Sequence, residues 1–248
     1  MRHVVDARGT AVGLPDRVGR VVSLVPSLTE WLVVAGVGER LVGVTDWCAE
    51  PAGALEGLAR VRGTKNPDLA AIRALEPDLV VANAEENRKL DVQRLEAGGL
   101  AVFVTMPTTV AGAVAELRDL AAAVGDLPGA AALDADLVAA VADAYRRRPG
   151  RRAYAADLLG LAGGEPVLDD PATRYPRLEL ETVAGLGPEV VLLPSEPYQF
   201  GEADAGELAA SFGGARVELV DGRALTWYGP RIPAALAAYR ELLMRVTS

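Results

Sequence analysis

One stretch of the chain occurs twice, and this internal repeat is the strongest constraint on the fold. Residues 69–83, LAAIRALEPDLVVAN, align without a gap over residues 180–194, LETVAGLGPEVVLLP. In both copies a short helical segment leads through Pro and an acidic residue into an apolar strand. A loop, a second helix, a Gly-Gly pair and another strand then follow in each copy. Agreement over so many successive elements predicts two similar α/β lobes.

The first lobe opens with a strand–helix–strand unit at residues 20–46. An apolar strand is expected at 20–25, and Ser27 stands three residues before Glu30, the spacing of a capping box. We therefore expect Ser27 to cap the helix that leads to the second strand at 41–44. A right-handed crossover makes the two strands parallel, and ligands of such sheets bind beyond the carboxyl ends of the strands.

The second lobe has no room for the matching first strand. Its expected helix at 154–161 and strand at 166–169 have counterparts in the first lobe, but only residues 149–153 stand before the helix. A parallel sheet that lacks a strand leaves the apolar faces of its helices uncovered. We therefore expect a sheet one strand shorter, covered by the long helix at 130–148 or by a second copy of the protein.

The predicted fold class is α/β, with two Rossmann-like lobes that have mainly parallel central sheets and are bridged by one long helix. The N-terminal lobe is expected at 1–128, the bridging helix at 129–149 and the C-terminal lobe at 150–248. The first 15 residues, MRHVVDARGTAVGLP, favour a β-hairpin over a signal peptide because they lack a continuous apolar core. This predicts a cytoplasmic protein, or an extracytoplasmic one if a leader was omitted from the sequence.

Composition excludes several functions. The formal net charge of −9 argues against nucleic acid and anionic membrane surfaces as partners. No apolar run approaches the ~18–20 residues of a membrane span. One His and one Cys exclude a His-rich metal site and an internal disulfide. Nucleotide-binding, hydrolase and metalloprotease signatures are missing from the sequence.

Two α/β lobes joined by one helix resemble the helical-backbone class of substrate-binding proteins, the cobalamin, haem and ferric-siderophore receptors of ABC importers. The resemblance covers nearly the whole chain and is carried by VVSLVPSLTE, GVTDW, RVRGTKNPDL, LEPDLVVANAEEN and DGRALTWYGPR. The best match is the cobalamin-binding branch. This resemblance implies a corrinoid or other planar metal chelate held between the lobes, with no cofactor required.

The resemblance also implies two acidic residues, one in each lobe, that dock on the permease. Glu181 stands at that position in the second lobe, but Ala70 holds it in the first. We therefore expect no productive coupling to an ABC permease. A non-exported binding protein, or a decayed copy without ligand, is then as consistent with the sequence as an importer receptor.

The candidate ligand residues come from the loops that follow the strands and from the start of the last helix. Aromatic faces there are suited to stacking on a macrocycle, and hydroxyl, carboxylate and guanidinium groups to its polar substituents. Core packing, helix capping or a solvated loop would explain several of them equally well. The predicted ligand-binding residues are Ser27, Thr29, Asp46, Trp47, Glu85, Glu86, Tyr198, Phe200, Trp227, Tyr228 and Arg231.

Cys48 is the weakest candidate in this set. Its thiolate would be an axial ligand for cobalt or iron, but a lone Cys is more often a small buried apolar residue.

The alternative to a binding module is a chelatase-like enzyme acting on a tetrapyrrole. Because the sequence offers only scattered carboxylates as a general base, we expect a binding protein and not an enzyme.

Overall fold

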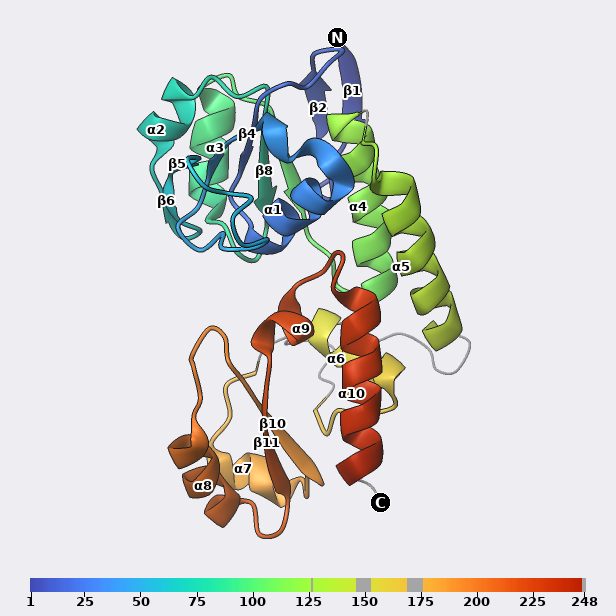
Figure 1. Cartoon of the computed structure of the whole chain (residues 1–248). Helices are drawn as coiled ribbons and strands as arrows, with labels where there is room; N and C mark the ends of the chain where they lie inside the picture. Colours follow the sequence, from blue (N-terminus) through green and yellow to red (C-terminus); the bar gives the residue numbers. More distant parts are fainter. Residues whose placement is uncertain (126, 146–152, 169–175, 247–248) are drawn as a thin grey trace. The chain divides into compact units, whose positions relative to one another are not determined.

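The computed structural model describes residues 1–125, 127–145, 153–168 and 176–246 and divides into two compact units. The first unit comprises Met1–Pro107, Ala111–Val138 and Tyr228–Pro230 (Figure 1). The second unit comprises Thr108–Val110, Ala139–Trp227 and Arg231–Ser248. The lobe boundaries predicted at 128 and 149 stay a prediction.

A five-stranded parallel sheet, in the order β5-β4-β3-β8-β9, forms the centre of the first unit. The predicted strand–helix–strand unit is present, with β3 and β4 paired in parallel on either side of the helix α1. The strands of this sheet are β3 (Val21–Ser23), β4 (Leu41–Val44), β5 (Ala59–Arg60), β8 (Leu79–Asn83) and β9 (Val102–Thr105). The helices between them are α1 (Pro26–Leu32), η1 (Val33–Val37), η2 (Gly38–Arg40), α2 (Leu69–Ala74) and α3 (Lys89–Ala97).

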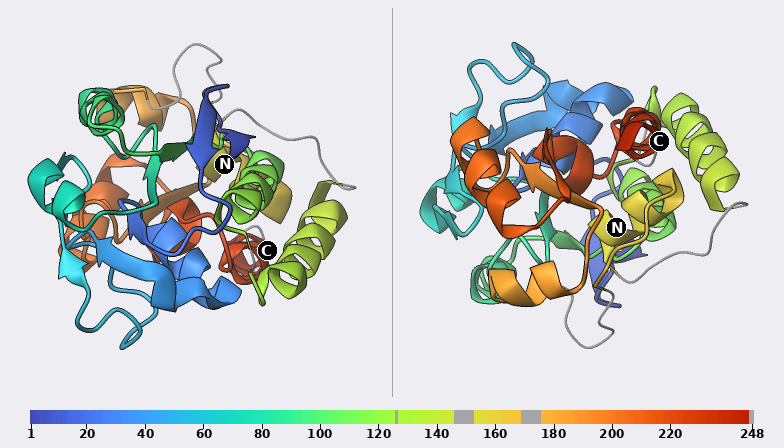
Figure 2. Two further views of the ribbon diagram at one scale, coloured as in Figure 1. Left: turned by 90° about the horizontal axis from the view of Figure 1, so that it is seen from above. Right: turned by 90° about the horizontal axis from the view of Figure 1, so that it is seen from below.

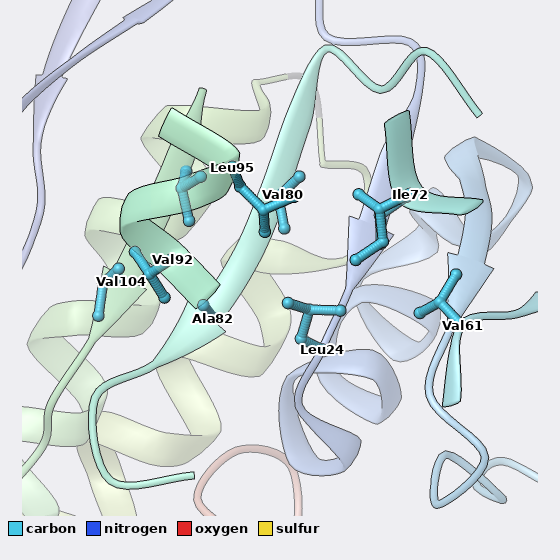
Figure 3. Close-up of a cluster of buried hydrophobic side chains, with 10 residues drawn as sticks. Leu24, Val61, Ile72, Val80, Ala82, Val92, Leu95 and Val104 are labelled. Carbon is cyan, nitrogen blue, oxygen red and sulfur yellow. The ribbon is translucent and has the colours of Figure 1, made fainter. Parts of the chain in front are cut away.

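The sheet buries its apolar side chains beneath α2 and α3. Figure 3 shows Leu24, Val80 and Ala82 from the β3 and β8 region facing Ile72 of α2 and Val92 of α3. Every residue of β8 and β9 is buried. These fully covered strands explain why the sequence here is a continuous apolar run without alternation.

A hairpin of β1 (Arg2–Val5) and β2 (Ala11–Leu14) precedes the sheet, as the sequence predicts. A second short antiparallel pair, β6 (Arg62–Gly63) and β7 (Asn66–Pro67), lies between β5 and α2. The long helices α4 (Val110–Val124) and α5 (Ala130–Tyr145) run side by side in Figures 1 and 2. Arg118 of α4 pairs with Asp134 of α5, with Arg118 Nε 2.5 Å from Asp134 Oδ1.

The second unit has a much smaller sheet. Its two strands, β10 (Val190–Pro194) and β11 (Arg216–Val220), pair in parallel, and α7 (Leu180–Gly185) and α8 (Glu202–Ser211) accompany them (Figure 1). The helix α6 (Tyr154–Ala162) packs against α10 (Ile232–Val246), and α9 (Gly222–Thr226) follows β11. Among the described residues of this unit no strand precedes β10. The predicted α/β class is confirmed. Among the described residues the sheet of the second unit has two strands and that of the first unit has five.

Two local predictions differ from the structure. The helix α1 begins at Pro26 with Val25 as its N-cap and has no side-chain cap, so the capping box at Ser27 is wrong. Proline is favoured at the first helical position, and here it starts the helix two residues earlier than a Ser27 cap would. Residues 166–168 form no strand, and no described strand of the second unit pairs with them. Asp169, residues 146–148 of the predicted long helix and residues 149–152 lie outside the described residues.

No helix in the described part of the chain is long and apolar enough to span a membrane.

Candidate ligand-binding site

The carboxyl ends of β3, β4, β8 and β9 meet at one edge of the first-unit sheet, because all these strands are parallel. We call this the carboxyl edge of the first unit. Three loops with predicted ligand residues leave from it: the start of α1 with Ser27, residues 45–48 with Trp47, and residues 83–88 with Glu85 and Glu86. The topology therefore brings these parts of the prediction together.

The loop after β4 presents Trp47 to solvent. Its side chain is 68% exposed, although the loop around it is held firmly. Arg60 donates from Nη1 to the carbonyl oxygens of Thr45 and Cys48, at 3.0 and 2.7 Å. A Cβ at Gly63 would lie 3.2 Å from Trp47 Nε1, so glycine leaves space for the indole. A large aromatic side chain exposed on a preformed loop is the kind of surface that binds a ligand.

A buried polar network lies behind this loop. Thr29 Oγ1 is 2.8 Å from Ser23 Oγ, 2.9 Å from the Val25 carbonyl oxygen and 3.1 Å from Cys48 Sγ. Thr45 Oγ1 is also 3.1 Å from Cys48 Sγ. Burial raises the pKa of the Cys48 thiol, which disfavours the thiolate that a metal ligand requires. Thr29 and Cys48 therefore hold the loops together in this structure.

Ser27 is the unusual member of the α1 loop. Its side chain is buried, yet Oγ has no hydrogen-bond partner among the described residues. An unsatisfied buried hydroxyl costs about 1–3 kcal/mol, and such groups call for an explanation.

Two asparagines shape the loop after β8. Asn83 Oδ1 accepts from the backbone N–H groups of Glu85 and Glu86, at 2.8 and 3.1 Å. Asn87 Oδ1 accepts from the Asn83 N–H at 2.8 Å, and Asn87 Nδ2 donates to the Thr64 carbonyl oxygen at 2.9 Å. Glu85 is exposed and Glu86 is half-buried, so the loop carries its carboxylates on a fixed backbone.

Tyr228 belongs to the first unit although it lies far along the chain. Its hydroxyl accepts from Asn83 Nδ2 at 2.9 Å and lies 2.8 Å from Thr105 Oγ1. The side chain is buried, and burial raises its pKa. Sequence reasoning proposed Tyr228 as a ligand contact, but in the structure its hydroxyl ties residues 228–230 to the carboxyl edge. That role depends on Asn83 and Thr105, which no sequence pattern indicated.

The corresponding loops of the second unit hold the remaining candidates. Tyr198 is 59% exposed and Phe200 half-buried, and their rings meet edge to face with centroids 4.8 Å apart. Trp227 is buried instead, and its Nε1 donates to Glu196 Oε2 at 3.2 Å. The guanidinium carbons of Arg223 and Arg231 lie 5.4 and 5.3 Å from the centroid of the Trp227 ring.

These contacts divide the predicted residues. The exposed or half-buried ones are Trp47, Asp46, Glu85 and Glu86 of the first unit and Tyr198 and Phe200 of the second. Thr29, Trp227 and Tyr228 are buried, and Arg231 lies against the Trp227 ring, so each of these side chains has an internal contact. Ligand contact by any member of the set stays a prediction.

Other parts of the first unit offer little for a metal or a second ligand. The described residues contain no cluster of His, Cys, Asp and Glu suited to a metal ion. A pocket of about 210 Å³ lies between α1, α4 and α5 and holds none of the predicted residues. Its lining residues are Trp31, Leu117, Arg118, Ala121, Ala130, Ala131, Asp134 and Leu137.

Comparison with known proteins decides the family. A profile of the periplasmic binding protein family matches residues 21–151, more than half of the chain. The chain belongs to this family. The membership confirms the resemblance seen in the sequence, and it confirms the expectation of a binding protein and not an enzyme.

Named relatives of this family member include vitamin B12-binding proteins. The protein of that name from Yersinia pestis (strain Pestoides F) is 27% identical over 206 residues, covering 75% of this chain and 73% of the relative.

Solved structures show the same fold. The periplasmic vitamin B12-binding protein BtuF of Vibrio cholerae has a TM-score of 0.78 at 21% identity, over 94% of this chain and 100% of that one. The periplasmic heme-binding protein RhuT from Roseiflexus sp. RS-1, in its apo form, has a TM-score of 0.76 at 22% identity, over 93% and 100% of the two chains.

Proposed function

We propose that this family member binds a corrinoid or another planar metal chelate through the loops at the carboxyl ends of its parallel strands. The observation that carries the proposal is Trp47, which is 68% exposed on a loop fixed by Arg60. An indole held in this way stacks on a flat macrocycle with little loss of conformational entropy. The names of the relatives, vitamin B12-binding and heme-binding proteins, agree with such a ligand.

Ser27, Asp46, Glu85 and Glu86 are the proposed polar contacts. The hydroxyl of Ser27 lacks a partner among the described residues, and the two glutamates stand on a loop fixed by Asn83. Amide side chains of a corrinoid would donate to these oxygens, whereas haem would present its own carboxylates to Glu85 and Glu86. Like charges repel, so this polar set favours the amide-bearing corrinoid over haem.

The test is a titration of the purified protein with cyanocobalamin, dicyanocobinamide and hemin, followed by tryptophan fluorescence and by calorimetry. We expect saturable binding of a corrinoid, weakened about five- to thirtyfold in Trp47→Ala, which is ~1–2 kcal/mol for one lost stacking contact. Leu90→Ala is the matched control, because Leu90 is also exposed, at 54%, but lies on α3. Failure of all three ligands to bind at tens of micromolar would refute the proposal.

We further propose that the chain does not couple to an ABC permease through two acidic anchors. Glu181 is exposed in the first turn of α7, but the equivalent place on α2 holds the exposed Ala70. Growth of an importer strain on limiting corrinoid should therefore require Ala70→Glu in an exported version of the protein. Rescue by the unchanged chain would contradict this.

The compartment is the remaining part of the proposal. The family name favours the extracytoplasmic alternative over the cytoplasmic location expected from the sequence. Residues 2–14 support neither location, because they form the β1–β2 hairpin of the first unit. Fractionation of the native host, with an antibody against this chain, distinguishes the two.

A further inference from the structure

The short edge strand β5 places one side chain beside the loop that carries Trp47. Both residues of β5 are exposed, so the strand contributes little to the core. It pairs in parallel with β4, and Arg60 lies opposite Val44 in this pairing. Because the 45–48 loop begins directly after Val44, the register brings Arg60 to the start of that loop.

The backbone on both sides of the indole is held from residues 60–62. One nitrogen of Arg60, Nη1, donates to the carbonyl oxygens of Thr45 and Cys48, at 3.0 and 2.7 Å. The Cys48 N–H donates to the Thr45 carbonyl oxygen as well, at 3.1 Å, which closes a turn. The Asp46 N–H donates to the Arg62 carbonyl oxygen at 2.9 Å. The residue that carries the indole is therefore flanked by two attached residues.

The indole itself is set against the β6–β7 hairpin. A Cβ at Gly63 would lie 3.2 Å from Trp47 Nε1 and 2.6 Å from Asn66 Oδ1. The Nε1 edge of the ring therefore rests on the hairpin, although 68% of the side chain is exposed. An exposed aromatic ring whose backbone and one edge are both fixed is preorganised for stacking.

We propose that Arg60 is a positioning residue, which holds the 45–48 loop in one conformation so that Trp47 binds its ligand without a further loss of backbone freedom. This inference rests on the function proposed for the carboxyl edge of the first unit. Arg60 acts through the loop and needs no contact with the ligand. Ordering one free loop residue on binding lowers the affinity about tenfold. Loss of the guanidinium should therefore weaken binding through a less favourable binding entropy.

The geometry specifies which substitutions preserve this role. Because a single nitrogen of Arg60 makes both bonds, the ammonium group of Arg60→Lys, with its three donors, can replace it. Arg60→Met keeps a long side chain but has no donor. Arg60→Gln is a second variant, with an amide that is too short to reach both carbonyl oxygens. Arg60 is exposed on an edge strand, so all three variants should fold, and circular dichroism checks this.

Arg20 provides a matched control on the same unit. Its Nη2 donates to the Leu75 carbonyl oxygen at 2.6 Å, and its Nε donates to the Glu76 carbonyl oxygen at 3.2 Å. Arg20 is also exposed, but it directly precedes β3 and so lies at the amino edge of the sheet, opposite the proposed site. Arg20→Met removes the same kind of contact without affecting the Trp47 loop.

The first measurement needs no ligand. The chain has three tryptophans, and Trp47 is exposed whereas Trp31 and Trp227 are buried. In protein labelled with 5-fluorotryptophan, the fluorine resonance of Trp47 is assigned by its absence from Trp47→Ala. We expect this resonance to narrow in Arg60→Met and Arg60→Gln, because the freed side chain moves faster. It should keep its wild-type width in Arg60→Lys and Arg20→Met.

The second measurement is a calorimetric titration of the same proteins with dicyanocobinamide. We expect Arg60→Met to bind about tenfold more weakly than the wild type, with the loss in the entropy of binding. Arg60→Lys and Arg20→Met should bind like the wild type. Adding Arg60→Met to Trp47→Ala should cause no further loss, because Arg60 acts only through the indole.

The outcomes separate this inference from the proposed function. A merely structural role would lower the melting temperature of Arg60→Met and leave the Trp47 resonance and the affinity unchanged, which would overturn the proposal. Equal weakening by Arg20→Met, or additive losses in the double variant, would also overturn it while the proposed function stands. A wild-type protein that binds no corrinoid would overturn the proposed function and the effect on affinity together.

Discussion

Replacing Tyr228 by Phe should destabilise the first unit by about 1–2 kcal/mol. The change removes the hydroxyl that accepts from Asn83 Nδ2 and lies 2.8 Å from Thr105 Oγ1, in a buried site. Each lost hydrogen bond is worth about 0.5–1.5 kcal/mol, and a buried donor left unpaired costs about 1–3 kcal/mol. Asn83 Nδ2 keeps a hydrogen bond of 3.3 Å to Thr105 Oγ1 in the variant, so we expect a loss of stability toward the lower end of these two ranges.

Urea unfolding, followed by circular dichroism and by tryptophan fluorescence, measures this loss. A double-mutant cycle with Thr105→Val should give a coupling energy of at least about 0.5 kcal/mol, since the two hydroxyls are in contact. Tyr239→Phe is the matched control and should lose less stability than Tyr228→Phe. The Tyr239 hydroxyl donates one longer hydrogen bond, of 3.2 Å, to the Asp221 carbonyl oxygen. A loss below about 0.3 kcal/mol, or an additive cycle, would refute the structural role of Tyr228.

Three further predictions concern stability. Gly43→Ala should lower the free energy of unfolding by about 1–3 kcal/mol, because the new Cβ would lie 2.5 Å from Leu75 Cδ1. Thermal melts should show that adding Leu75→Ala relieves part of this loss. A Gly43→Ala protein as stable as the wild type would contradict the packing. Asp157→Ala should lower the free energy of unfolding by about 1–2 kcal/mol in the same assay, because Asp157 Oδ2 accepts from the Val110 N–H at 2.7 Å and so caps the start of α4. A variant as stable as the wild type would contradict that cap. Burial raises the pKa of Tyr239 from 10.0 to about 12, so its contribution to stability is complete below pH 10 and is lost as the pH rises toward 12. Urea titrations over this range should show a weaker pH dependence in Tyr239→Phe, and identical curves would contradict it.

The repeat at 69–83 and 180–194 made most of the fold predictable. Apolar runs bounded by Pro, Gly and acidic residues specify strands and helices locally, and α2, β8, α7 and β10 follow the predicted order. A strand needs a neighbour to pair with, and no described strand pairs with residues 166–168, which are not a strand in the structure. Local sequence does not record the loss of a partner elsewhere in the chain.

The site was less predictable than the fold. Trp47 and Trp227 look equivalent in the sequence, yet one is 68% exposed and the other 9%. Burial of Trp227 depends on Glu196, Arg223 and Arg231, which only the folded chain brings together. The spacing of Ser27 and Glu30 predicts a helix cap at Ser27, but the helix begins at Pro26 with Val25 as its N-cap. Side-chain contacts of this kind arise from tertiary structure, which periodicity and spacing do not encode.

The central claim is that the carboxyl edge of the first unit binds a planar metal chelate. The most direct measurement is a calorimetric titration of the protein, and of its Trp47→Ala variant, with dicyanocobinamide. The account predicts one saturable site in the wild-type chain, with affinity reduced about five- to thirtyfold in the variant for one lost stacking contact. Equal affinity in the two proteins, or no heat of binding in the wild-type protein at tens of micromolar, would contradict it.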